Sequence, residues 1–182
     1  MGLVINDDNL RDCEVEEFSR KVRAILVDED NKILIANYYN LILLPGGKVE
    51  DNESIYTAIR RELKEETGKD YSEEELELFE ILNYYQKNYL TRNEVIRNRL
   101  VQIYYFIGKY KGVKQERQKL TESEQKANFR LELVPLYNIE KIIKNNKNDN
   151  PRNIYFQKEL LTILELYKTT DKVIKKQKKE LL

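Results

Sequence analysis

Apolar and polar residues alternate along the first third of the chain in blocks that predict strands. Residues 21–27 and 32–37 are apolar enough for two strands, and the polar residues 28–31 between them are typical of a hairpin turn. A third apolar run, 41–44, must end at 45–47, because proline cannot donate to a strand ladder and paired glycines favour a turn. This part of the chain therefore predicts a hairpin and a short strand that leads into a glycine turn.

The residues after this turn have the period of an amphipathic helix. Between residues 54 and 67, Ile55, Ile59 and Leu63 recur every four residues, and Gly68 is a natural C-terminal stop. We therefore predict a helix over 54–67.

The rest of the chain predicts a mixture of strands and helices. Its expected elements are strands over 76–85, 101–110 and 131–136, a short helix over 138–143, a loop over 144–151 and a helix over 155–167. We expect one domain over 1–150 with its core at about 20–143, and a C-terminal helix and tail over 151–182, packed on the domain or trailing from it. The lysine-rich stretch 172–182 is better explained as a frayed, solvated helix end than as a nucleic-acid-binding tail.

Composition narrows the chemistry that the chain can support. Lysine plus arginine and aspartate plus glutamate both number 32, so no net charge attracts the protein to nucleic acid or a membrane. Cys13 is the only cysteine, and no apolar run approaches the roughly 18 residues of a membrane helix. These features, with no secretory signal at the N-terminus, predict a cytoplasmic protein. The sequence has no histidine, so acid–base or metal chemistry must use carboxylates, lysines or tyrosines.

The predicted helix over 54–67 carries carboxylates on its apolar side. Glu62 and Glu66 project onto the face defined by Ile55 and Ile59, with Glu65 beside it. Carboxylates directed toward a domain repel one another and lose hydration, so a positive partner is required. Hard divalent cations such as Mg²⁺ prefer oxygen ligands and are held by a few carboxylates together with substrate phosphates. This face therefore predicts a metal–phosphate site.

The same residues match a known family pattern. Gly47, Glu53 and the run 61–68 (RELKEETG) resemble the Nudix box, and 44–47 (LPGG) resembles the segment that commonly precedes it. Lys69 departs from the aliphatic residue usual after the last glycine. The resemblance implies an α/β fold, a Nudix-type α/β/α sandwich with a mixed sheet, to which this chain adds a C-terminal helix.

The resemblance also implies roles for individual residues. Glu62, Glu65 and Glu66 would hold Mg²⁺, or Mn²⁺ in its place, Gly46 would lend its carbonyl oxygen, and Arg61 with Glu53 would position the carboxylates. The general base is either Glu62 or a glutamate from a later loop, for which Glu122 and Glu124 are the candidates; Glu124 is also a candidate metal ligand.

The expected activity is Mg²⁺-dependent hydrolysis of a diphosphate linkage in a nucleoside diphosphate derivative, by attack of water on phosphorus. Tyr84 and Tyr85 are candidates for stacking on the base, although strand packing is the favoured explanation for both. The alternative function is a nucleotide-sensing domain without turnover, and a plain interaction domain is a weaker one. The expected partner is a small nucleotide-like substrate, and no membrane binding is expected. The one nucleic acid among the candidate substrates is an RNA 5′ end. A homodimer is compatible with the sequence.

Overall fold

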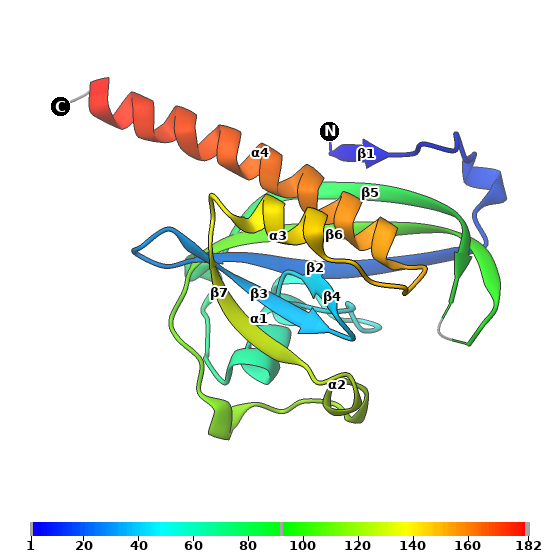
Figure 1. Cartoon of the computed structure of the whole chain (residues 1–182), viewed down its shortest axis with the longest axis horizontal. Helices are drawn as coiled ribbons and strands as arrows, with labels where there is room; N and C mark the ends of the chain where they lie inside the picture. Colours follow the sequence, from blue (N-terminus) through cyan, green and yellow to red (C-terminus); the bar gives the residue numbers. More distant parts are fainter. Residues whose placement is uncertain (1, 92, 181–182) are drawn as a thin grey trace.

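The computed structural model describes residues 2–91 and 93–180, with side chains described as far as Asp171, and it shows a mixed sheet with helices on both faces (Figure 1). The strands are β1 (Leu3–Ile5), β2 (Glu17–Val27), β3 (Lys32–Tyr38), β4 (Leu41–Leu43), β5 (Glu77–Leu90), β6 (Ile96–Lys109) and β7 (Arg130–Pro135). The α-helices are α1 (Ile55–Thr67), α2 (Glu122–Lys126), α3 (Ile139–Asn145) and α4 (Asn153–Glu180). Short 3₁₀ turns occur at Asp12–Glu14, Glu73–Glu75 and Gln115–Arg117.

The sheet has the strand order β1-β5-β6-β2-β3-β4, with β7 paired to β3. β2 runs parallel to β6 along its whole length, but it meets β3 only where Val27 faces Ile33. The two strands then diverge, and the glycine turn fills the gap between them. There Val22 N–H donates to the Gly47 carbonyl (3.0 Å) and Ala24 N–H to the Pro45 carbonyl (2.9 Å). The turn is therefore built into the sheet as a direct neighbour of β2.

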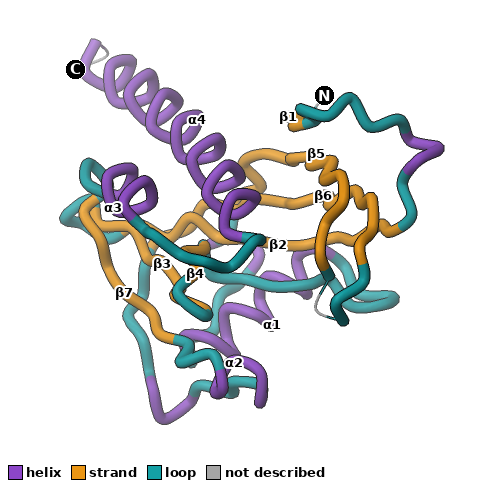
Figure 2. The backbone as a smooth tube through the Cα atoms, turned by 45° about the vertical axis from the view of Figure 1, so that its right-hand side comes forward, coloured by secondary structure: helices purple, strands orange, loops and turns teal. Residues whose placement is uncertain are grey.

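Helices lie on both faces of the sheet (Figure 2), and each face has its own hydrophobic core. On one face, α1 packs through Ala58, Ile59 and Leu63 against side chains of β2, β3 and β6. On the other, α3 and α4 cover the sheet, and Ile163 and Leu164 of α4 are fully buried. Because α1 packs on the face next to the glycine turn, its carboxylates are carried to the edge of that turn.

The expected α/β class with a mixed sheet and a C-terminal helix is confirmed. The predicted elements occur, with different lengths: β5 and β6 extend further into their connecting hairpin, and α4 continues to Glu180 rather than ending at 167. No glycine or proline follows Pro151, so nothing in the sequence interrupts this helix. The side chains of 172–182, where a frayed and solvated end was expected, lie outside the described residues. β1 and α2 were not predicted.

Across the described residues, no helix is both long and apolar enough to cross a membrane.

The packing of α4 predicts that alanine substitutions at two positions on this helix differ in their effect on the free energy of unfolding. Replacing the fully buried Leu164 by alanine should lower the free energy of unfolding by about 2–5 kcal/mol, because it leaves a cavity. Ile154→Ala is the matched control, since this residue is 68% exposed on the same helix and its loss should change stability by less than about 0.5 kcal/mol. Urea denaturation measures both. Equal effects would show that α4 does not pack on the sheet in solution.

Candidate functional site

Helix α1 is fixed at both ends. The Ser54 hydroxyl caps its start by accepting the Thr57 N–H at 3.0 Å. Gly68 ends it in the left-handed conformation (φ 68°), and its N–H donates to the Lys64 carbonyl. Residues 114–119 bind the last turn: Lys114 N–H donates to the Thr67 carbonyl (2.7 Å) and Lys119 N–H to the Glu65 carbonyl (2.8 Å). The helix therefore offers its glutamates from a rigid support.

Arg61 organises three of the carboxylates. Its Nε and Nη2 donate to the two oxygens of Glu53 at 2.9 and 3.0 Å, a bidentate pair. Its Nη1 donates to Glu62 at 2.9 Å and to Glu65 at 3.3 Å. The hydrogen bonds from Arg61 lower the pKa of Glu53, and those to Glu53 raise the pKa of Arg61. The structure thus brings together Glu53, Arg61, Glu62 and Glu65.

Glu66 is the most deeply buried carboxylate of this group, with 3% of its surface exposed. Its Oε2 accepts the Gly46 N–H at 2.8 Å. Burial raises the pKa of Glu66 well above its usual value, and the nearby positive charge of Arg23 opposes this rise. Burial also raises the pKa of Glu62, against the influence of Arg61. Both carboxylates are therefore partly desolvated and sensitive to any cation that approaches them.

The two glycines of the turn allow the helix and the sheet to approach closely. At Gly46 (φ 129°), a Cβ would collide with the carbonyl of Val22 in β2. At Gly47, a Cβ would overlap the carboxylate of Glu62. At Gly46 any other residue would be strained and would push the turn away from β2, whereas a side chain at Gly47 would displace the Glu62 carboxylate.

The residues at this site fit a hard divalent cation, because all the candidate ligands are oxygen atoms and the Glu62 carboxylate packs directly on the glycine turn. Each carboxylate is nevertheless held by a protein donor. Among the described residues, no three aspartate, glutamate or cysteine side chains already converge on one point. Glu62 and Glu65 contact Arg61, and Glu66 contacts Gly46. A metal would require small side-chain movements from these partners.

The two later glutamates lie on α2, not in a loop. Glu124 caps its own helix, accepting the Thr121 N–H at 2.6 Å, yet its charge is close enough to raise the pKa of Glu66. Glu122 is exposed and faces Lys126 at 4.0 Å. The structure thus brings Glu124 near the carboxylate group and leaves Glu122 at the surface.

Tyr84 and Tyr85 lie on opposite faces of β5, as neighbours in a strand do. Tyr84 is 4% exposed and packs in the core beneath α4, near Tyr155. A ring this buried has no free face for a base, so core packing accounts for Tyr84. The Tyr85 hydroxyl donates to Asp12 at 2.7 Å. Among the residues that the structure describes, neither tyrosine forms a hydrogen bond with the carboxylates of α1.

One residue of the site was missed by sequence reasoning. Arg23 lies in β2 between the fully buried Val22 and Ala24, and it is itself buried. Its Nη1 donates to the carbonyls of Leu44 (3.1 Å) and Gly46 (2.5 Å). The sequence does contain a signal that could have identified Arg23. It places a permanent charge within an otherwise apolar strand, and a buried charge requires a partner.

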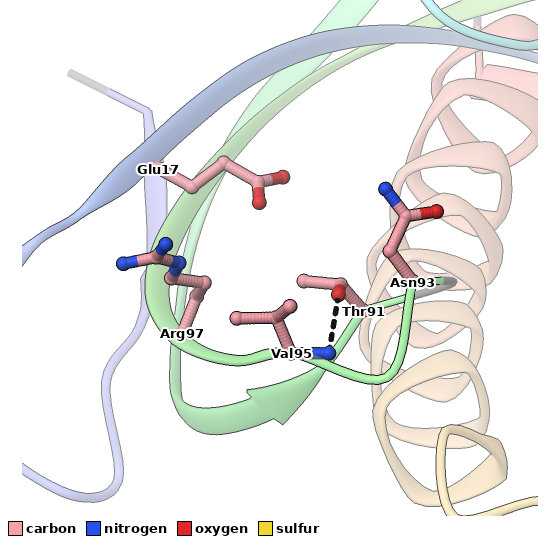
Figure 3. Close-up of a pocket in the computed structure, with 5 residues that line it drawn as sticks. All are labelled: Glu17, Thr91, Asn93, Val95 and Arg97. Atoms are coloured by element: carbon pink, nitrogen blue, oxygen red, sulfur yellow. Dashed lines mark hydrogen bonds between the residues drawn. The ribbon is translucent and has the colours of Figure 1, made fainter.

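Two hollows lie away from the carboxylates. One, of about 400 Å³, lies over β3, β4, β7 and α3, and is lined among others by Asn37, Ile42, Lys141 and Asn145. The other, of about 220 Å³, lies at the tip of the β5–β6 hairpin (Figure 3). It is lined by Glu17, Thr91, Asn93, Val95 and Arg97 and contains none of the predicted site residues.

Comparison with known proteins identifies relatives of the fold. The family model described as NUDIX domain matches residues 17–156. The NUDIX hydrolase from Nitrosomonas europaea is 20% identical, with a TM-score of 0.52 over 80% of this chain and 90% of that chain. The MutT mutator protein from Bacillus halodurans is 22% identical, with a TM-score of 0.50 over 76% of this chain and 80% of that chain. No curated protein matches the sequence.

The Glu53–Arg61 pair should make stability depend on pH. Because the pKa of Glu53 is lower in the folded protein, its ionised form stabilises the fold above the unfolded pKa of about 4.3. This contribution is lost as pH falls through the folded pKa. Glu53→Gln should therefore lower the free energy of unfolding by roughly 1–3 kcal/mol at pH 7 and by progressively less in acid.

Urea denaturation between pH 2.5 and 7 measures this difference. Glu77→Gln, at an exposed position at the start of β5, is the control and should follow the parent protein at every pH. A Glu53→Gln deficit that stayed constant across the range would contradict the ion pair.

Proposed function

This chain belongs to the NUDIX domain family, and on that premise we propose that it hydrolyses a diphosphate linkage in a nucleoside diphosphate derivative, with Mg²⁺ or, in its place, Mn²⁺. Members of the family are generally hydrolases. The observation that supports the proposal is the group of partly desolvated glutamates that α1 presents to the glycine turn. Such a group is costly to a fold that does not use it.

We assign the metal to the Gly46 carbonyl, Glu65 and Glu66. Of Glu62 and Glu124, the one that does not act as the general base would be a further ligand. When bound, the metal would neutralise negative charge on the diphosphate and leave its phosphorus open to in-line attack. Arg61 supports this arrangement, because its contacts with Glu53 fix the guanidinium while Nη1 holds Glu62 and Glu65. Arg61 and Glu53 therefore position the carboxylates.

Glu62 is the proposed general base. A water oxygen attacks phosphorus, the water proton passes to the Glu62 carboxylate, and the bridging P–O bond breaks to release two phosphate products. Burial raises the pKa of Glu62, which makes its ionised form a stronger proton acceptor than an exposed glutamate. Glu124, near Glu66, is the second candidate, whereas Glu122 is exposed and paired with Lys126.

We propose that the nucleoside binds in the 400 Å³ hollow and does not stack on Tyr84. Ile42 lines the hollow and precedes Gly46 by four residues, which corresponds to roughly 13 Å of extended chain. The side-chain amides of Asn37 and Asn145 can both donate to and accept from a base edge, and Lys141 can contact a phosphate. Because the hollow lies on the α3 side of the sheet and α1 on the other, we propose that the substrate extends from the hollow past β4 to the glycine turn.

A nucleotide-sensing domain without turnover is the second candidate function. It is favoured by one observation, that the described carboxylates are held by protein donors and do not already converge. Binding of nucleotides without release of product would distinguish this function from hydrolysis.

Substitution of the carboxylates tests hydrolysis. Glu65→Gln and Glu66→Gln keep side-chain volume but remove a negative charge, so Mg²⁺ affinity and turnover should both fall while circular dichroism stays unchanged. Glu62→Gln should lower turnover by about 100-fold or more if it removes the base, and should also change the shape of the pH–rate profile.

The measurement is a screen of nucleoside diphosphate derivatives with Mg²⁺, in which released phosphate or monophosphate is detected. Glu74→Gln, in an exposed acidic run, is the control and should behave as the parent. Folded Glu65→Gln and Glu66→Gln proteins that hydrolyse substrate as fast as the parent at saturating Mg²⁺ would refute the site.

The nucleoside hollow has a separate test. Asn37→Ala should raise KM by roughly fivefold, the effect of losing one hydrogen bond of about 1 kcal/mol, and leave kcat nearly unchanged. Asn93→Ala, in the hairpin hollow, should leave both constants unchanged. A lowered kcat at unchanged KM would argue that Asn37 does not contact the nucleoside.

A further inference from the structure

Arg23 is a buried cation that the proposed reaction does not use directly. It has 6% of its surface exposed and lies in β2, parallel-paired to β6. Arginine keeps its charge in proteins, so its burial requires compensating contacts. Its Nε has no hydrogen-bond partner among the described residues, so these contacts do not satisfy the whole guanidinium.

The contacts of Arg23 all serve the glycine turn. Its Nη1 donates to the carbonyl of Leu44 and to that of Gly46, while the backbone of the next residue, Ala24, donates to the intervening carbonyl of Pro45. With the Val22 N–H bound to the Gly47 carbonyl, the four successive carbonyls of residues 44–47 are held by β2. Two of the four depend on the Arg23 side chain.

Gly46 is consequently held from two directions. Its carbonyl accepts from Arg23 in the sheet, and its N–H donates to Glu66 in α1. The positive charge of Arg23 also lies close enough to Glu62 and Glu66 to favour their ionised forms. Arg23 therefore acts on the turn by hydrogen bonding, and the turn itself contacts Glu66.

We propose that Arg23 is a positioning residue for the metal site, which fixes the Gly46 carbonyl from inside the sheet and so holds the turn against Glu66. The inference rests on the proposed metal role of Gly46 and Glu66. A carbonyl oxygen has two lone pairs, so Gly46 can accept from Arg23 and still offer a ligand. A purely structural Arg23 would support β2 without influencing the site.

Two substitutions of Arg23 test this role against a matched control. Arg23→Gln removes the charge, and Arg23→Lys keeps the charge but cannot hold both carbonyls in the same geometry. The control is Arg99→Gln: Arg99 is similarly buried (8% exposed) in β6, but it donates to Gln86 and stacks on Tyr89. Both glutamine variants should lower the melting temperature.

The first readout is the hydrogen-exchange rate of the Gly46 amide, measured by NMR without metal. After correction for the change in global stability, this rate should rise about tenfold or more in Arg23→Gln. In Arg99→Gln the corrected rate should stay near that of the parent. The second is the Kd for Mg²⁺ alone, measured by calorimetry. It should rise 10- to 100-fold in Arg23→Gln, the range found when a group that orients metal ligands is lost. Arg23→Lys should recover part of this loss.

The outcomes separate this inference from the proposed function. If the parent binds Mg²⁺ and folded Arg23→Gln and Arg23→Lys bind it equally well, the positioning role is wrong and the metal site stands. If the parent does not bind Mg²⁺, the proposed function and the metal role fail together. If the hydrogen-exchange rate of the Gly46 amide is unchanged in both Arg23→Lys and Arg23→Gln, Arg23 does not hold the turn. If Arg23→Gln does not fold, the decision passes to Arg23→Lys.

Discussion

The cost of desolvating carboxylates is the constraint on which this structure depends. Helix α1 buries Ala58, Ile59 and Leu63 to hold its place on the sheet, and the same packing carries Glu62 and Glu66 away from water. Two arginines offset that cost from opposite sides, Arg61 from the helix itself and Arg23 from β2. The pKa of both carboxylates stays raised despite these arginines, which is why we propose that an additional cation completes the compensation. Stability and proposed chemistry thus make opposite demands on the same residues.

The sheet topology makes this balance possible. β2 and β3 pair only where Val27 faces Ile33, and the glycine turn lies beside the preceding residues of β2, with its carbonyls paired to Val22 and Ala24. The turn gains the rigidity of a strand while its Gly46 and Gly47 backbone remains at the edge of α1. A loop projecting into solvent would have to be ordered at the moment of binding, whereas this one is ordered by the fold.

Local sequence patterns predicted much of this architecture. The spacing of Ile55, Ile59 and Leu63 located α1, and the acidic positions on its inner side indicated the face at which the carboxylates gather. The three-residue β1 was missed because so short a strand has no readable period, and it forms only by pairing with β5. Arg23 was missed because its role depends on contacts between distant segments, whereas the favoured explanation for Tyr84, packing within the strand, agrees with its burial. Sequence identifies which residues share a helix face, but not what that face meets.

The contact of residues 114–119 with the end of α1 bears on how the protein folds. Lys114 and Lys119 donate to carbonyls of the last helical turn, and Gln118 donates to the carbonyl of Glu66. These partners are separated by about fifty residues, and β5 and β6 lie between them in the chain. Closing so long a loop carries an entropic penalty that local helix formation does not. The carboxylate end of α1 is therefore completed by a distant segment, and we expect changes in the length of the β6–α2 connection to act on it.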